Sequence, residues 1–486
     1  MKKIPLKLKK YDHIIISLFL LLPFFLVLGS FLSDLTASIY ALGFLIYIIK
    51  KKYFKYLNNN YFYYFLTIYI YLNINSLFSF NPTLSFQSSA TYIRMILFSL
   101  CVSFLLKKIS DLNKFFFISI TSCLIILFID SLIQFFTGFN LVGYVAEERI
   151  SSFFEKKLVL GSFVTRILPI LLGLIFVLEI KYKKYIGFFI VFISGVLVFL
   201  SGERLAFAYF SITIFFFLLF FFNIKEKIIL ISFLLISFGA LTTASSRFYD
   251  RIFLHTLSQL KEGKSVLSIS YRHELHFITA YNMYLDSKLI GHGLKSFRHL
   301  CGSKKYNPLE KINNDNIRIS SFDGIVEIEE ILPSTEEALH YYLYIKQDKN
   351  ILAKHKVAGE YINFFVKNGD AVKSGDNLFS SYAYNSGCNT HPHNFYLHLL
   401  SETGIIGFAL FFLLFLFLLY NLILNFYKIL KTKNNKLNKM NFFFLLGLCL
   451  SLFPLFPTGS FYNNWLLVLF YLNLGFLINY YSLIKK

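Results

Sequence analysis

Long apolar runs recur from one end of the chain to the other, and they restrict the fold more than any other feature of the sequence. The 486 residues are 56% hydrophobic and 20% aromatic, and the runs are rich in Phe, Leu and Ile. A helix of about 20 apolar residues crosses the hydrocarbon core of a bilayer, so runs of about 18 residues or more indicate membrane spans. The sequence therefore predicts an all-α polytopic membrane protein.

The order of the runs predicts about 12 transmembrane helices and one large loop. The helices are expected near residues 13–32, 34–50, 60–80, 90–106, 114–137, 157–180, 185–201, 204–222, 227–246, 396–427, 441–458 and 463–482. The first run has no small-residue cleavage site and a second run follows at once, so we interpret it as a retained helix rather than a signal peptide. Residues 1–245 then hold the first nine helices, residues 246–395 form the loop, and residues 396–486 hold the last three.

The formal net charge of +21 is distributed in a pattern that indicates topology. Lysine clusters occupy every second connection between runs and both termini, whereas the connections at 81–90 and 456–464 contain no Lys or Arg. Because cytoplasmic loops are enriched in positive charge, both termini are predicted to be cytoplasmic and the 246–395 loop periplasmic. The lysines are explained by topology, so we expect membrane lipids and no nucleic acid as partners.

The periplasmic loop contains predicted helices and a small β-rich insertion at 301–388. The pattern is helical from 246 to 298, and two turns, Asn368-Gly369-Asp370 and Ser374-Gly375-Asp376, then separate short strands. The run 366–376 resembles a hairpin of biotinyl/lipoyl-like β domains but lacks the carrier lysine in its usual setting, so a structural module is expected rather than a cofactor site. Cys301 and Cys388 bracket the insertion, and an oxidising periplasm permits a disulfide between them if their Cβ atoms approach.

Polar side chains gather at the start of the helix predicted at 396–427. Among His391, His393 and His398, we single out His393 as a general base, because a near-neutral imidazole can accept a proton from a hydroxyl nucleophile. The alternative is a histidine bonded to backbone at a helix start. No carboxylate or cysteine pattern completes a zinc site, so neither a metal nor a cofactor is expected. Glu402, inside the span, is a candidate to orient a cation or cap polar groups.

Four arginines are candidates for binding an anionic substrate. Arg204, where one span turns into the next, either snorkels to the interface or binds a phosphate in bidentate fashion. Arg272 is either solvated or paired with an anionic lipid head group. Arg166 lies inside a predicted span, where a charge needs a cavity or a partner. Arg149 precedes that span and either joins the same cluster or is solvated.

Three motifs together resemble the O-antigen ligase and O-antigen polymerase superfamily. Its signature is a histidine followed by Asn, Ser or Gln, then nine residues and Gly-x-x-Gly, which here runs from His393-Asn394 to Gly404-Ile405-Ile406-Gly407. Ser201-Gly202-Glu203-Arg204 is similar to the family's arginine at a span end. The segment from Arg272 through Gly291-His292-Gly293 to Phe297 is similar to its arginine and Gly-x-Gly-x-x-x-Phe turn. The resemblance covers about residues 140–300 and 385–470.

The resemblance implies glycan transfer on the outer face of a bacterial inner membrane. In that family a glycan linked to undecaprenyl pyrophosphate moves onto lipid A-core in ligases, or onto another lipid-linked repeat in polymerases. The family's catalytic histidine maps to His393 and its pyrophosphate-binding arginines map to Arg204 and Arg272. Asn394, Arg166 and Arg149 are further substrate-binding candidates. The 301–388 insertion departs from the family pattern and leaves the acceptor open.

Two other classes of function are compatible with parts of the sequence. About 12 spans with internal charges also suit a lipid flippase or other transporter, although we find no internal repeat and the large loop is off-centre. A polymer-binding or scaffold protein that acts through the β-rich insertion would lose function without the insertion and would not need His393.

Overall fold

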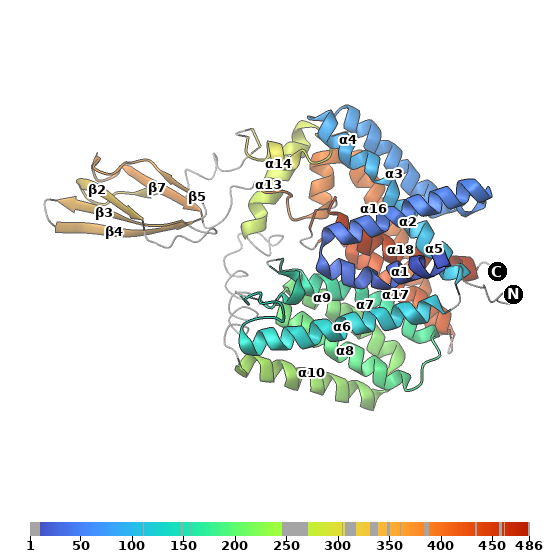
Figure 1. The fold of residues 1–486 in the computed structure, drawn as a ribbon. Helices are drawn as coiled ribbons and strands as arrows, with labels where there is room; N and C mark the ends of the chain where they lie inside the picture. The colour runs from blue at the N-terminus through green and yellow to red at the C-terminus, as the bar shows by residue number, and fades with distance from the viewer. Residues whose placement is uncertain are drawn as a thin grey trace.

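The computed structural model is mostly helical, with a small β module beside the helical body (Figure 1). It describes residues 10–109, 111–146, 149–155, 157–244, 271–303, 305–306, 317–330, 339–347, 350–359, 361–382, 388–432, 435–455, 459–460 and 462–484. Before the large loop the helices are α1 (Lys10–Leu28), α2 (Ser30–Lys51), η1 (Phe54–Tyr56), α3 (Asn60–Leu77), α4 (Pro82–Thr91), α5 (Ile93–Lys108), α6 (Leu112–Thr137), η2 (Ser152–Phe154), α7 (Leu160–Val177), α8 (Lys183–Ser201), α9 (Arg204–Phe221) and α10 (Ile224–Ala244). The loop contains α13 (Tyr271–Asp286) and α14 (Phe297–Leu300), and the chain then forms α16 (Phe395–Lys431), α17 (Lys436–Ser451) and α18 (Asn464–Ile484).

Every apolar run that predicted a span coincides with a helix, but seven helical segments in the described chain are long and apolar enough to cross a membrane. They are α2, the combined α4 and α5, α6, α7, α8, α9 and α16. Boundaries differ where prolines or glycines intervene: the helix expected to reach 458 ends at Ser451, shortly before Pro454. The helical pattern expected from 246 was tested only in part, since residues 245–270 lie outside the described chain.

The helical body packs its helices closely, and small residues permit the closest approach. At the α7–α17 contact, a Cβ on Gly447 would clash with Pro169 and Asn473, and a Cβ on Gly173 would press on Phe444 and the Met440 carbonyl. Glycine at such crossings lets helix backbones approach, which dispersion forces reward in a membrane. The main cluster of buried apolar side chains includes residues of α1, α2, α3, α5 to α10 and α16 to α18. This packing gives the site described below a rigid base.

The β module forms two antiparallel sheets within the predicted insertion. Its strands are β1 (Ile317–Ile319), β2 (Gly324–Glu330), β3 (Leu339–Gln347), β4 (Asn350–Gly359), β5 (Tyr361–Phe364), β6 (Ala371–Val372) and β7 (Asn377–Tyr382). The strand orders are β1-β7-β5 and β4-β3-β2-β6, and the sheets enclose their own small core of Val326, Leu343, Ile345, Val357, Val366, Val372, Leu378 and Phe379.

The two predicted turns of the module share one geometry. Gly369 and Gly375 have φ of 91° and 102°, which a glycine adopts at little cost. The carboxylate of Asp370 accepts a hydrogen bond from the Lys367 N–H at 2.7 Å. Asp376 accepts the equivalent bond from the Lys373 N–H, also at 2.7 Å. The turn prediction is therefore confirmed at both positions.

Candidate functional site

The segment that follows the large loop begins as a capped helix and then breaks. The side-chain oxygen of Asn394 accepts hydrogen bonds from the N–H groups of Tyr396 and Leu397, both at 3.0 Å, and so caps α16. Further along α16, Gly404 has a φ of 61° and a ψ of −166°, and this backbone conformation is not helical. The residues between these two points form a short helical segment set at an angle to the rest of α16. His393 lies immediately before this segment.

The turn that leads into α14 packs against the break in α16. The N–H of His292 donates to the Ser401 carbonyl at 3.1 Å, and the N–H of Gly293 donates to the Glu402 carbonyl at 2.8 Å. The N–H of Ile405 donates in return to the Lys288 carbonyl at 2.8 Å. The two glycine motifs noted in the sequence therefore meet each other.

Glycine is required on both sides of this contact. A Cβ on Gly291 would lie 2.5 Å from the backbone carbon of Glu402, and a Cβ on Gly404 would overlap the Leu289 carbonyl. Both glycines also have positive φ, of 67° and 61°. Because a backbone cannot move away from a backbone without breaking the hydrogen bonds between them, any side chain here separates the turn from the helix.

Glu402 anchors the same junction and is 0% exposed. Its two carboxylate oxygens accept hydrogen bonds from the N–H of Lys295 at 2.8 Å and the N–H of Phe297 at 3.0 Å. One oxygen also lies 3.2 Å from Nε2 of His398, one turn earlier on α16. Of the two roles expected for Glu402, the structure thus favours the capping of internal polar groups.

His393 lies in a cluster of histidine rings from two elements. Its ring centroid is 4.3 Å from that of His391, 4.9 Å from that of His273 and 5.1 Å from that of His276. The last two residues lie three positions apart on α13, so they share one face of that helix. Their spacing is the sequence signal that could have identified them, but only the fold brings that face to His393.

The backbone and the surroundings of His393 are both unusual. Its φ is 54°, which a non-glycine residue adopts only at a cost, and such strain is concentrated at functional sites. Burial, together with the neighbouring histidines, lowers the pKa of His393 to about 2 and that of His391 to about 3. Both imidazoles are therefore neutral at pH 7, and a neutral imidazole can accept a proton. Within the described chain no three His, Cys, Asp or Glu side chains are arranged to hold a metal ion.

Asn394 has a structural position that the sequence did not indicate. Besides capping α16, its amide nitrogen donates to the Pro454 carbonyl at 3.1 Å, which ties the helix start to the α17–α18 connection. Three hydrogen bonds thus hold the residue next to His393. Asn394 therefore acts on the site by fixing the position of His393, whatever contact it makes with a substrate.

Three of the four candidate arginines gather where α8 turns into α9. The carboxylate of Glu203 accepts hydrogen bonds from the Gly161 N–H at 2.8 Å and the Ser162 hydroxyl at 2.6 Å, so it caps the start of α7. Burial raises the pKa of Glu203, while Arg166, one turn into α7, opposes this rise. Arg204 follows directly as the first residue of α9. The N–H of Ile150, next to Arg149, donates to the Leu200 carbonyl at 3.4 Å, near the end of α8.

A pocket lies between this corner and the start of α16. Arg166 and Phe395 both line it, together with Phe411, Ser451, Leu452, Gly459, Ser460, Leu466, Leu467 and Phe470. Phe395 is two residues after His393, so this pocket joins Arg166 of the arginine corner to the helix that begins beside His393. Arg272 is the second residue of α13 and precedes His273, but its side chain lies outside the described residues.

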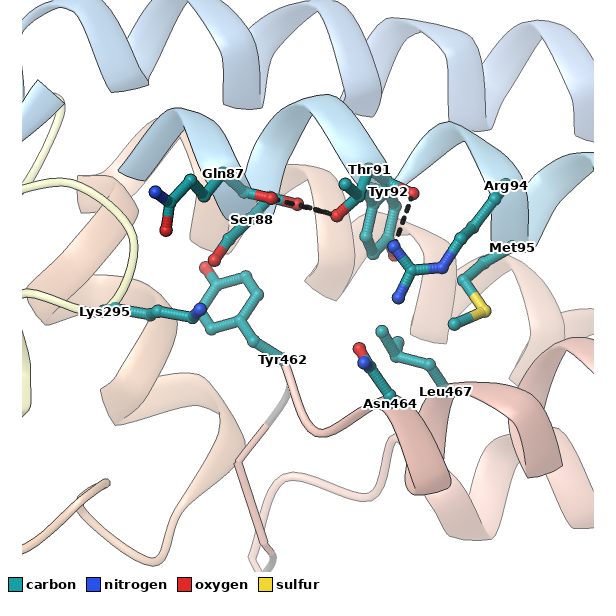
Figure 2. A pocket seen from close by; sticks show the side chains of 10 residues that line it. All are labelled: Gln87, Ser88, Thr91, Tyr92, Arg94, Met95, Lys295, Tyr462, Asn464 and Leu467. Atoms are coloured by element: carbon teal, nitrogen blue, oxygen red, sulfur yellow. Dashed lines mark hydrogen bonds between the residues drawn. The ribbon is translucent and has the colours of Figure 1, made fainter. Parts of the chain in front are cut away.

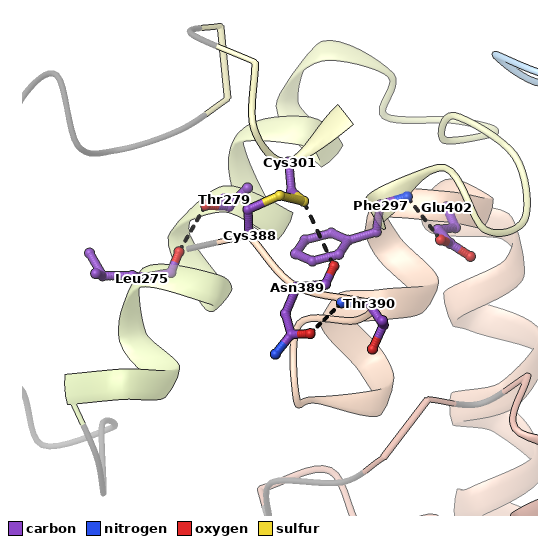
Figure 3. The surroundings of a disulfide bond; sticks show 8 residues. All are labelled: Leu275, Thr279, Phe297, Cys301, Cys388, Asn389, Thr390 and Glu402. Atoms are coloured by element: carbon purple, nitrogen blue, oxygen red, sulfur yellow. Dashed lines mark hydrogen bonds between the residues drawn. A yellow bond between two sulfur atoms is a disulfide. The ribbon is translucent and has the colours of Figure 1, made fainter. Parts of the chain in front are cut away.

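A disulfide joins Cys301 to Cys388 and closes the base of the β module (Figure 3). The Cα atoms are 4.9 Å apart although 87 positions separate the residues in sequence. Cys301 is buried in a cluster with Ala280, Met283, Phe297 and Tyr306. The bond therefore ties the segment that leads to His391 and His393 to the same α13–α14 unit that supplies the other histidines.

Residues 189–321 match the family model described as O-antigen ligase, and this range contains Arg204, Arg272, His273, the Gly291–Phe297 turn and Cys301. Members of this family are glycosyltransferase-type membrane enzymes of O-antigen pathways. No curated protein matches the chain. Over residues 189–321 the chain is thus similar to the O-antigen ligase family, and its apolar helices are those of a multi-pass membrane protein.

Proposed function

We propose that the chain is an O-antigen ligase-type glycosyltransferase that moves a glycan from undecaprenyl pyrophosphate to a hydroxyl of lipid A-core. The observation that carries this proposal is His393, a strained and neutral imidazole placed by the family's own motif next to a corner of arginines. The matched family model supports the reaction class.

In the proposed reaction one bond forms as another breaks. The acceptor hydroxyl oxygen attacks the anomeric carbon of the donor glycan, and His393 takes the hydroxyl proton. The bond between the anomeric carbon and the pyrophosphate oxygen breaks, and undecaprenyl pyrophosphate leaves with the electron pair. A single displacement inverts the anomeric configuration, and cations stabilise the charge that develops on the leaving group. This route needs no metal ion.

The low pKa of His393 links its role as a base to the binding of the donor. In the protein alone, burial and four neighbouring histidines keep the ring neutral, which also makes it a weak base. A diphosphate bound close by would stabilise the imidazolium and raise the pKa, so that His393 becomes a stronger base only beside its substrate. We assign the diphosphate to Arg204 and Arg272, with Arg166 and Arg149 as further contacts.

We further propose that five more helices also cross the membrane, namely α1, α3, α10, α17 and α18. This gives 12 spans, with both termini in the cytoplasm of a bacterial inner membrane. In Figure 1, α1 begins and α18 ends at one end of the helical body, and the β module lies beyond the other end. If successive spans alternate in direction from α1, the helix ends with lysines at Lys51 of α2, Lys108 of α5 and Lys183 of α8 belong to the side where α1 begins. Labelling of single cysteines introduced at 58 and 434 should require permeabilised cells, while one at 373 should react in intact spheroplasts; the reverse pattern would contradict the topology.

The test of catalysis is His393→Ala in cells that depend on this chain for surface polysaccharide. General-base catalysis contributes about 10² to 10⁴ in rate, so transfer should fall by at least the lower figure. His299→Ala is the matched control, because His299 is exposed on α14 in the same loop and should transfer normally. Full transfer by His393→Ala at equal protein level would refute the role.

The arginines are tested by donor binding. Arg204→Ala and Arg272→Ala should each weaken binding of a lipid-linked oligosaccharide about tenfold or more, because each removes a hydrogen bond to a charged group. Arg318→Ala, on β1 of the module, should bind as the unchanged protein does. If both variants bind the donor normally, the assignment of the diphosphate to Arg204 and Arg272 is wrong. That result would support a transporter that binds no diphosphate at this corner.

Polymerase activity is the alternative within the same family. A strain lacking the chain separates the two: loss of all ligated polysaccharide indicates a ligase, and a single ligated repeat without a ladder indicates a polymerase. Unchanged ligation and ladder length would exclude both and leave the transporter class.

A further inference from the structure

A second cavity is lined in part by Lys295 of the Gly291–Phe297 turn and contains none of the residues assigned above to chemistry or donor binding (Figure 2). Its volume is about 340 Å³. It is bounded by α4 and α5, by the turn, and by the start of α18, through Gln87, Ser88, Thr91, Tyr92, Arg94, Met95, Lys295, Tyr462, Asn464 and Leu467. Most of this lining is polar, which is unusual among helices this apolar.

Lys295 lines the cavity and has a strained backbone conformation. Its φ is 62°, and its N–H is held by the carboxylate of Glu402 at 2.8 Å. Burial and the nearby Arg298 lower the pKa of its ammonium group, so an anion placed beside it would relieve an unfavourable charge. Glu402, the acid that acts on Lys295, already accepts from two backbone N–H groups and adjoins His398.

The second cation of the cavity, Arg94, is already compensated. Its guanidinium forms a bidentate pair with Asp34, in which Nε donates to Oδ1 at 3.2 Å and Nη2 donates to Oδ2 at 3.1 Å. Asn464 donates to the same carboxylate at 3.0 Å. These residues form a rigid polar wall, and Lys295 supplies the charge that a ligand would meet.

The hydroxyl group of Ser88 indicates that the cavity binds a ligand. The hydroxyl oxygen is buried and has no hydrogen-bond partner among the residues that the structure describes. A buried polar group without a partner calls for an explanation, because leaving it so costs about 1–3 kcal/mol. In Figure 2 the side chains of Ser88 and Lys295 both point toward the ring of Tyr462. An aromatic face, a hydroxyl, amides and a cation in one small cavity suit a sugar ring that carries an acidic group.

We propose that this cavity binds a sugar unit with an anionic substituent, and that it is a subsite for the glycan acceptor. The acidic group would pair with Lys295, and the sugar hydroxyls would bond Ser88, Gln87 and Asn464 beside the Tyr462 ring. The inference rests on the proposed glycan transfer.

A continuous series of ring contacts leads from this cavity to His393. The centroid of Tyr462 is 5.3 Å from that of His398, which is 6.4 Å from that of His391, which is 4.3 Å from that of His393. An acceptor seated in the cavity could therefore extend toward the base.

The test measures binding of three small probes to the full-length protein in detergent: glucose 6-phosphate, glucuronate and glucose. We expect at least one charged probe to bind and glucose to bind about tenfold more weakly, since a charge-assisted hydrogen bond is lost. Preference between the phosphate and the carboxylate identifies the acidic group. If neither charged probe binds more tightly than glucose, the proposal is overturned.

Three variants locate the binding. Lys295→Asn removes the cation with a residue that tolerates positive φ, and should weaken charged probes about tenfold. Lys295→Arg should retain binding, and Lys288→Asn, which removes an exposed lysine shortly before the turn, should have no effect. His393→Ala should bind the probes normally while losing transfer, so failure of the subsite leaves the proposed chemistry untouched. Normal binding by Lys295→Asn would place the probes elsewhere and refute the inference.

Discussion

Two residues of the His393–Gly407 motif hold backbone conformations that most residues avoid. His393 has φ 54° and Gly404 has φ 61°. The first bears a side chain and is held there by the capped start of α16, while the second can adopt this angle at little cost because it lacks a Cβ. At the residue scale, the motif therefore combines a strained reactive group with a glycine that shapes its support.

Gly404→Ala should uncouple the turn from α16. The new methyl group would meet the Leu289 carbonyl in a backbone conformation unfavourable to alanine, so we expect a loss of about 2 kcal/mol or more in stability, together with a large loss of transfer. Thermal unfolding in detergent and transfer in cells measure the two effects. Gly239→Ala in α10 is the control, because nothing lies within 4 Å of its Cβ position and alanine favours helix. Equal behaviour of the two variants would contradict this account.

The histidine cluster predicts that acid destabilises the protein. His391 and His393, with pKa of about 3 and about 2 in the fold, face His273, His276, His398 and Arg298. Between about pH 6.5 and pH 3 the unfolded chain binds protons on these imidazoles and the folded chain does not, so stability rises with pH in that window.

Lowering the pH from 7.5 to 5 should therefore cost roughly 1–2 kcal/mol for each of the two histidines. Unfolding temperature measured against pH tests this expectation. The double variant His391→Gln and His393→Asn should show a flatter profile, and a profile as steep as that of the unchanged protein would assign the effect to other groups.

At the scale of elements, the junction between α14, the Gly291–Phe297 turn and broken α16 organises the site. Glu402 sits at its centre, and its carboxylate replaces hydrogen bonds that the turn cannot make within itself. The same junction contacts the histidine cluster through Glu402 and His398, and it contains Lys295, which lines the cavity. Any change in the junction should therefore act on both.

Glu402→Gln should weaken the junction without changing its size. An amide nitrogen in place of an oxygen faces N–H donors, so at least one buried hydrogen bond is lost at a cost of about 1–3 kcal/mol. We expect a lower unfolding temperature and a lower rate of glycan transfer from donor to acceptor. Ser401→Ala, which removes only a hydroxyl bonded within its own helix, is the control. Unchanged stability in Glu402→Gln would show that the carboxylate is not needed as an acceptor.

At the scale of the whole molecule, the β module is attached to the helical body through a narrow base. The disulfide brings Cys301 and Cys388 together, and the module has a hydrophobic core separate from that of the helices. Tyr306 belongs to the base rather than to the module, since it packs with Ala280 and Phe297 and donates to Asp286 at 2.6 Å.

Replacing residues 308–386 by a short Gly-Ser linker should therefore leave the helical body folded and His393-dependent transfer intact. The deletion begins after Tyr306 so that the base keeps its packing. Transfer in cells and thermal unfolding measure the outcome. A folded variant without transfer would mean that the module itself handles the glycan, as the scaffold alternative requires, and His393→Ala in the full chain would then show whether chemistry is also needed.

Local patterns in the sequence were enough to identify the class of the protein and the centre of its candidate site. Apolar runs long enough to span a bilayer gave helices at every expected position, because in lipid the backbone must satisfy its own hydrogen bonds. The turns of the insertion were equally readable, since Gly369 and Gly375 each meet a local conformational need. His393 was identified from a local motif.

Only the tertiary structure decided which distant residues meet at that motif. His273 and Lys295 lie about 100 positions from the residues they adjoin, and Gly291 faces Gly404 across a similar separation. Nothing in local spacing predicts such contacts, because they depend on how the elements pack. The reason that Gly404 must be glycine, and the polar cavity beside Lys295, are properties of that packing alone.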